Sequence, residues 1–125
     1  MEKKKLIVVI DDDPEILQFS KLTLEAQGHE VKSALSGAEG IELFKSCKPD
    51  LVLCDLMMER IDTGVGVASQ IRMKDKNVPI YLMSSVGESM AANINIHELG
   101  FNGLLQKPVS IDDLITHVNR ALRLD

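Results

Sequence analysis

Short apolar runs alternate with amphipathic segments along the chain. Five runs, most of them rich in β-branched residues, lack the polar alternation of a half-exposed strand: residues 6–10, 31–35, 51–54, 79–83 and 103–105. Runs of this length and character are typical of strands that are covered on both faces. The pattern therefore predicts five strands, of which the run at 31–35 is the weakest.

The segments that follow these runs have apolar residues at helical spacing. Asp13 before Pro14, Ser36 and Ser110 are placed as N-cap residues at the start of three of them. The predicted helices run from residue 14 to a stop at Gly28, from Ser36 to a stop at Pro49, over 64–74, over 88–99 with a stop at Gly100, and from Ser110 to residue 122.

The spacing also predicts which helical side chains face the core. In the first helix Phe19 and Leu22 belong to the apolar stripe, and in the second helix the stripe is Ala38, Ile41 and Phe44. The last helix has the clearest stripe, because its apolar residues follow the i, i+3, i+4, i+7 rule from Ile111 to Leu122.

Five alternating strands and helices predict an α/β fold with a parallel sheet, right-handed crossovers and helices on both faces. A length of 125 residues fits one domain, which we place at residues 1–125. In such a sheet, ligands bind beyond the carboxyl ends of the strands. The residues at those ends are therefore the first candidates for a functional site.

Composition narrows the class of protein. Apolar residues make up 45% and charged residues 26% of the chain, which excludes collagen-like and disordered proteins, and no apolar run is long enough to span a membrane. The formal charge of 14 − 19 = −5 disfavours nucleic acid as a direct partner. The first apolar run is too short for a signal peptide and leads into Asp11, so we expect a cytoplasmic protein.

Cysteine and histidine spacing gives no sign of a zinc site or a disulfide. Cys47 and Cys54 form no CxxC pair, and we interpret both as packed free thiols. His29, His97 and His117 share no ligand spacing, and we interpret them as surface residues.

Chemically useful residues follow four of the five predicted strands. These are Asp11 and Asp12 after the first strand, Asp55 after the third, Ser84 after the fourth and Lys107 after the fifth. Carboxylates held within about 4 Å repel by roughly 4 kcal/mol per pair at an effective dielectric constant near 20, so such a cluster favours a bound cation. Carboxylate oxygens suit Mg²⁺, and Lys107 and Ser84 are suited to bind phosphate oxygens. Asp55 then remains as a nucleophile able to form an aspartyl phosphate.

Each residue also has a simpler explanation. Asp13 fits an N-cap and nothing more, Asp11 and Asp12 fit a solvated turn, and Lys107 fits an exposed turn before Pro108. Ser84 would be explained by a hydrogen bond to the backbone. Because four strand ends carry such residues together, we prefer a common site to four coincidences.

With these residues in place, the sequence resembles the receiver domain of two-component response regulators, in particular the chemotaxis-type regulators that consist of this domain alone. The resemblance covers residues 6–122 and is carried by four motifs: VIDDDPEIL at 9–17, PDLVLCDLMM at 49–58, PIYLMSS at 79–85 and QKPV at 106–109. It implies a flavodoxin-like (βα)5 sandwich with sheet order 2-1-3-4-5.

The resemblance also implies roles for individual residues. Asp55 would be the phosphoacceptor and Asp12 a direct ligand of Mg²⁺ or Mn²⁺, with Asp11 acting mostly through water and the backbone carbonyl of Met57 completing the metal ligands. Ser84 would contact the phosphoryl group. Lys107 would be the site lysine, with a cis bond to Pro108.

The same resemblance implies a signalling switch and not an enzyme in the usual sense, since it would promote only its own phosphorylation and dephosphorylation. The donor would be a histidine kinase or a histidine phosphotransfer protein. The output would be a protein bound at the face formed by the fourth helix, the fifth strand and the fifth helix, with no membrane or direct nucleic-acid partner.

Three features depart from the family pattern: the loop after Asp55 and the residues at two single positions. Glu59 replaces the usual proline, and Gly64 comes one residue late, which makes the loop over the site longer and more charged. Leu104 occupies the position of an aromatic switch residue, and Ser85 stands where alanine is common. The loop and Leu104 leave the means of signal output open.

Two alternative functions fit some of these residues. A receiver-like module could bind partners without phosphorylation. A small phosphohydrolase of the haloacid dehalogenase type also uses an aspartate nucleophile, and Asp11 and Asp13 form a DxD motif, but that chemistry places the nucleophile after the first strand.

Overall fold

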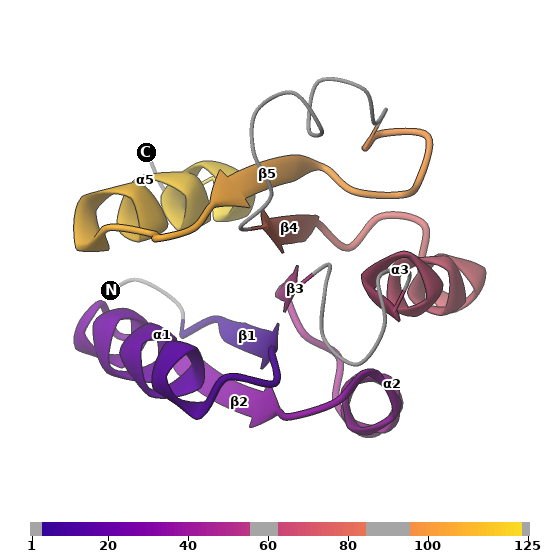
Figure 1. Ribbon diagram of the computed structural model, residues 1–125, viewed down its shortest axis with the longest axis horizontal. Coiled ribbons are helices and arrows are strands. Elements are labelled where there is room, and N and C mark those ends of the chain that lie inside the picture. The colour runs from indigo at the N-terminus through magenta and orange to yellow at the C-terminus, as the bar shows by residue number, and fades with distance from the viewer. Residues whose placement is uncertain (1–3, 56–62, 85–95, 124–125) are drawn as a thin grey trace.

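The computed structural model describes residues 4–55, 63–84 and 96–123, and its ribbon is shown in Figure 1. Five parallel strands form one sheet in the order β2-β1-β3-β4-β5, as predicted. The strands are β1 (Leu6–Ile10), β2 (Glu30–Ala34), β3 (Leu51–Asp55), β4 (Ile80–Ser84) and β5 (Gly103–Gln106).

Helices cover both faces of this sheet. They are α1 (Pro14–Ala26), α2 (Gly37–Ser46), α3 (Thr63–Lys74) and α5 (Ile111–Leu122). In Figure 1, α1 and α5 lie on one side of the strands and α2 and α3 on the other. Most of the predicted helix over 88–99 lies outside the described residues. Its predicted stop is described: Gly100 has a φ of 98°, and the N–H of Phe101 donates to the carbonyl of Ile96, which is the pattern of a helix C-terminus.

Two apolar clusters explain why the strands are so uniformly hydrophobic. Every residue of β3 and β4 is buried, because one set of side chains faces α1 and α5 and the other set faces α2 and α3. Leu53 and Leu114 belong to the first cluster, and Val52 and Ile71 to the second. The continuous apolar runs therefore mark strands between two helix layers, as predicted.

The core face of α2 differs from the prediction. Phe44 is buried and Ile41 is half-buried, but Ala38 is exposed, and glycines take the remaining core positions. A Cβ atom built on Gly40 would overlap the Cδ1 atom of Ile10. Helix α2 therefore packs so close to β1 that a side chain at this position has no room.

Two predictions about exposure are wrong near α1. Leu22 is 62% exposed, whereas His29, predicted to be a surface residue, is only 7% exposed. Gly28, with a φ of 93°, turns the chain back at the end of α1, and the N–H of His29 donates to the carbonyl of Leu24. This turn directs the chain inward before β2 begins.

Within the described residues, no helix has the length and hydropathy that crossing a lipid bilayer requires.

Arg72 connects several segments at the amino ends of β4 and β5. Its guanidinium donates to the carbonyls of Gly100 (3.0 Å), Asp75 (3.2 Å) and Val78 (2.6 Å). It also donates to the Oδ1 atom of Asn102 at 2.8 Å. Burial lowers the pKa of Arg72, although the charge of Asp75 acts in the opposite direction. The side chain thus joins the end of α3 to the starts of two strands.

Candidate functional site

The carboxyl ends of the strands bring the predicted site residues together. Asp55 and Ser84 are the last residues of β3 and β4, and Asp11 directly follows β1. The strand pairing extends to these ends, since Asp55 is opposite Met83 and Ser84 is opposite Gln106. Asp11, Asp55 and Ser84 are all buried, at 0%, 5% and 3% exposure. Parallel pairing therefore places them at one edge of the sheet, as the sequence predicts.

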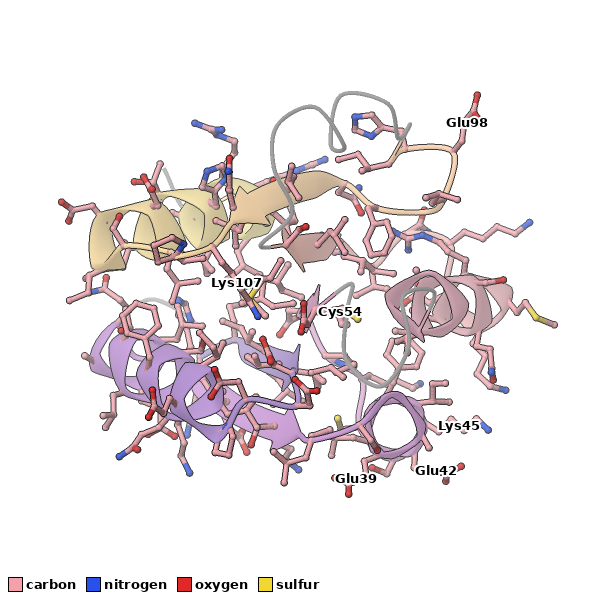
Figure 2. All side chains as sticks on the ribbon, in the orientation of Figure 1. Glu39, Glu42, Lys45, Cys54, Glu98 and Lys107 are labelled. Atoms are coloured by element: carbon pink, nitrogen blue, oxygen red, sulfur yellow. The ribbon has the colours of Figure 1, made fainter. Side chains whose placement is uncertain are left out.

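Lys107 reaches this cluster from the chain after β5. Its Nζ atom lies 2.7 Å from Oδ2 of Asp11 and 3.5 Å from Oδ2 of Asp55. Figure 2 shows the Lys107 side chain among oxygen atoms between β1 and β3. Its own N–H donates to the carbonyl of Ser84 at 2.8 Å, and its bond to Pro108 is cis, as expected. Backbone and side chain of Lys107 thus connect the ends of three other strands.

Asp11 is held on both of its oxygens. Oδ2 accepts from Lys107, and Oδ1 accepts from the backbone N–H of Asp13 at 2.9 Å. The Asp13 side chain caps α1 by accepting from the N–H of Glu15 at 2.9 Å, as predicted. The sequence did not reveal that the backbone of Asp13 also orients Asp11. That contact depends on the turn between β1 and α1.

The electrostatics of the cluster follow from its burial. Burial alone disfavours the charged ammonium of Lys107, but the hydrogen bond and charge of Asp11, together with Asp55, outweigh it and raise the pKa of Lys107. Burial, with the charges of Asp55 and Asp11, raises the pKa of the Cys54 thiol to about 12. Cys54 is a buried free thiol and Cys47 a half-buried one, in line with their interpretation as packed residues.

The donor set fits a divalent cation. One carboxylate oxygen from each of Asp11, Asp12 and Asp55 lies within 4.8 Å of the others. Two oxygens on opposite sides of an octahedral Mg²⁺ are about 4.2 Å apart, twice the usual bond length, so small movements suffice to bring these atoms into its coordination sphere. Three carboxylates and one ammonium carry a formal charge of −3 + 1 = −2, which a divalent cation balances.

Several predicted residues lie outside the described residues. Met57, which the resemblance names as a metal ligand, is one of them, and so are Glu59 and Ser85. The structure describes the backbone of Gly64, at the start of α3, but not its surroundings. Leu104 is half-buried and packs against the cluster of apolar residues on the α2–α3 side of the sheet.

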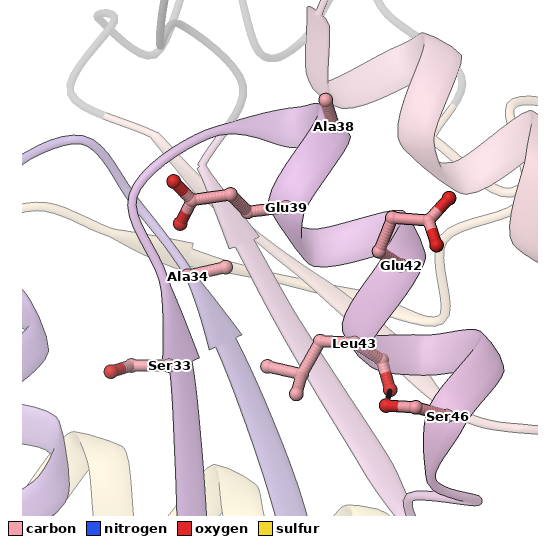
Figure 3. Close-up of a pocket in the computed structure, with 7 residues that line it drawn as sticks. All are labelled: Ser33, Ala34, Ala38, Glu39, Glu42, Leu43 and Ser46. Carbon is pink, nitrogen blue, oxygen red and sulfur yellow. Dashed lines mark hydrogen bonds between the residues drawn. The ribbon is translucent and has the colours of Figure 1, made fainter.

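A separate hollow of about 610 Å³ lies between β2 and α2 and is not part of the aspartate cluster (Figure 3). Ala38, Leu43 and Ser46 are among its lining residues, and the Ser46 hydroxyl donates to the carbonyl of Leu43 at 3.0 Å. In Figure 3 Glu39 turns toward β2, where it accepts from the N–H of Leu35, whereas Glu42 points away. None of the predicted site residues lines this hollow.

The chemistry at the sheet edge agrees with a comparison to known families. Residues 7–119 match the response regulator receiver domain. The chain belongs to this family. This receiver domain also shares its fold with the receiver domain of the Francisella response regulator 1452, with a TM-score of 0.85 and 30% identity over 97% of this chain and 98% of the other.

Longer proteins contain a similar domain. The receiver domain is 34% identical to the probable transcriptional regulator ycf27 of Guillardia theta, over 98% of this chain and 47% of the relative. It is 29% identical to the DNA-binding dual master transcriptional regulator RpaA of Synechocystis, over 94% of this chain and 48% of the relative. The chain spans about half the length of these curated relatives. Since they are named as regulators of transcription, the expectation of no direct nucleic-acid partner finds no support.

Proposed function

We propose that this receiver domain is a phosphoacceptor switch in which Asp55 accepts the phosphoryl group. The observation that carries the proposal is the meeting of Asp11, Asp12 and Asp55 within 4.8 Å, with the ammonium of Lys107 3.5 Å from Asp55. Receiver domains are signalling modules, and this arrangement supplies a nucleophile, a cation and a place for a metal ion at one edge.

The transfer is a substitution at phosphorus. A carboxylate oxygen of Asp55 forms the new P–O bond, and the bond between phosphorus and the donor breaks, with its electron pair leaving on the donor group. Lys107 lies close enough to balance charge that develops on the phosphoryl oxygens. The Ser84 hydroxyl, at the end of the neighbouring strand, would donate to one of them.

The proposed metal is Mg²⁺ or Mn²⁺, held by Asp12 and Asp55, by Asp11 mostly through water, and by the backbone of Met57. Asp12 is exposed and none of the described hydrogen bonds uses its carboxylate, whereas both oxygens of Asp11 are engaged. This difference supports direct ligation by Asp12 and an indirect role for Asp11. The bound ion would offset the negative charge shared by the carboxylates and the incoming phosphoryl group.

The proposed output is a shift in conformation at the β4–β5 edge. The backbone N–H of Lys107 donates to the backbone carbonyl of Ser84, so the chain after β5 and the end of β4 are joined next to both side chains, and a shift in one would displace the other. We propose a histidine kinase or histidine phosphotransfer protein as donor, and an effector, a partner protein or an attached output domain, that responds to the face containing β5 and α5.

The test is phosphorylation by acetyl phosphate with Mg²⁺, followed by intact mass measurement. We expect a gain of about 80 Da for one phosphoryl group, abolished in Asp55→Asn and by removal of Mg²⁺ with a chelator. Asp50→Asn is the matched control, because Asp50 immediately precedes the same strand, β3, and contacts the backbone of Leu6 at the opposite end of the sheet.

The outcomes separate the alternatives. Continuous release of phosphate without a stable adduct would support a phosphohydrolase. No adduct and no release would support a module that acts without phosphorylation. Loss of the adduct in both Asp55→Asn and Asp50→Asn would indicate damage to the fold and would leave Asp55 without its assigned role.

A further inference from the structure

A second charged pocket lies at the opposite end of the sheet from the carboxylates. It has a volume of about 370 Å³ and is formed by the end of α5 and the starts of β4 and β5. This volume is within the usual range for sites that bind small molecules. Its polar lining consists of Asn77, Tyr81, Asn102, Arg120 and Arg123.

The charges in this pocket are all positive. Arg120 and Arg123 each carry a guanidinium group with five N–H donors. Neither guanidinium has an ion pair or a hydrogen bond to the described residues, and no Asp or Glu is among the residues that line the pocket. In a chain with 19 acidic and 14 basic residues, two arginines that have no carboxylate partner among residues 4–55, 63–84 and 96–123 point to an external anion.

The neutral groups in the pocket offer further donors. Tyr81 is only 8% exposed, and its ring is held against Gly103 and at an edge-on angle to His117, with ring centroids 6.0 Å apart. Its hydroxyl is in none of the hydrogen bonds of the described residues. Asn102 uses its oxygen to accept from Arg72 at 2.8 Å and from the N–H of Ile80 at 2.9 Å, so its amide group is left as a donor.

We propose that this pocket binds a small molecule through a phosphate group, independently of Asp55. Two guanidinium groups, a phenol and an amide donor exceed what one carboxylate accepts, whereas a phosphate dianion has three oxygens and pairs with arginine in a two-pronged geometry. Placement near the last carbonyls of α5 accounts for one cation through the helix dipole. It does not account for the buried tyrosine and the oriented asparagine beside it.

The test is a titration of the full chain with inorganic phosphate, without Mg²⁺ and at constant ionic strength, followed by backbone amide NMR. We expect saturable shifts at Tyr81, Asn102 and Arg120. The double variant Arg120→Gln and Arg123→Gln should bind at least about tenfold more weakly. The control is Lys45→Gln with Lys48→Gln, which changes the net charge equally near the end of α2 and should bind as the wild type does.

Circular dichroism shows whether the variants fold. If the glutamine variant is unfolded, the double variant Arg120→Lys and Arg123→Lys replaces it. Because lysine keeps the charge but loses the paired donors, weaker binding is again expected. Shifts that do not saturate would indicate an adventitious ion only and would overturn the proposal. The proposal would also be overturned if the variant at Arg120 and Arg123 bound phosphate as tightly as the control variant at Lys45 and Lys48. Shifts confined to the end of α2 or to the residues around Lys107 would overturn it as well.

Discussion

Lys107, at the carboxyl end of the sheet, and Arg72, at its amino end, have opposite surroundings. At the carboxyl end, the cluster of Asp11, Asp12 and Asp55 has one ammonium among the described residues, that of Lys107, and so keeps an excess of negative charge. At the amino end, the guanidinium of Arg72 donates to three carbonyls and to an asparagine oxygen. The carboxylate cluster therefore keeps a net negative charge, whereas the hydrogen-bond donors of Arg72 find acceptors within the chain.

Arg72 and Lys107 are both half-buried cations, but they have different roles. Arg72 fills acceptors that the backbone would otherwise leave unpaired, so its contribution is to stability. Lys107 contacts acidic groups that are themselves crowded, so its contribution depends on what else the site holds. If this distinction is correct, Mg²⁺ should change the stability of a variant at Lys107 and leave that of a variant at Arg72 unchanged.

The largest effect is expected for Lys107→Met. It leaves the carboxylate of Asp11, which has no exposed surface, without its ammonium, and we expect the free energy of unfolding to fall by about 3 kcal/mol. Because a divalent cation can replace part of the missing charge, Mg²⁺ should restore part of this loss. Urea unfolding followed by circular dichroism, with and without Mg²⁺, measures both.

The matched control is Lys45→Met. Lys45 lies 3.8 Å from Glu42, with both side chains largely exposed, and such surface pairs contribute little. A loss in the Lys107 variant no larger than in this control would show that Asp11 does not depend on Lys107.

A smaller effect is expected for Arg72→Met. Removal of its donors leaves the carbonyls of Val78 and Gly100 short of partners in a partly buried region, and we expect a loss of about 2 kcal/mol in urea unfolding. Mg²⁺ should restore none of it, in contrast to Lys107→Met. Lys74→Met serves as control, because Lys74 is exposed and lies two residues further along α3, at its end. Recovery of the Arg72 variant by Mg²⁺ would contradict the comparison.

The smallest effect concerns pH. The pKa of Lys107 is raised in the folded protein above its ordinary value of 10.5, so its stabilising contribution is complete below pH 10.5 and is lost as the pH rises through the folded-state pKa. The difference in unfolding free energy between wild type and Lys107→Met should therefore stay constant at neutral pH and shrink above pH 10.5. A difference that shrinks on acidification instead would contradict this assignment.

Most of the fold could be predicted because its signals are local. Strand runs and N-caps such as Asp13, Ser36 and Ser110 are visible in a few consecutive residues, and all three caps are present. The ends of β3 and β4 were placed one residue early, because Asp55 and Ser84 are polar, although sheet pairing includes them. The same pairing is why the strand ends meet as predicted.

The features that the sequence did not predict depend on contacts with the backbone or on glycines, which have no side chain. The Arg72 network uses main-chain carbonyls, which no side-chain pattern records. The core face of α2 was misplaced at Ala38, because glycines carry part of the stripe and a hydrophobic pattern does not count them. The burial of His29 follows from the turn at Gly28, which the sequence marks but does not orient.

The close approach of α2 to β1 also limits how this protein can change over evolutionary time. Gly40 has no room for a methyl group because Ile10 fills the space, and Ile10 is bonded in sequence to Asp11. A substitution at Gly40 would therefore displace Ile10, the residue just before Asp11 and Asp12, although Gly40 itself takes no part in the chemistry. Drift at this helix position should be restricted as tightly as at many residues of the site, and a saturation library at Gly40 and Ile10 should recover the two positions as a correlated pair.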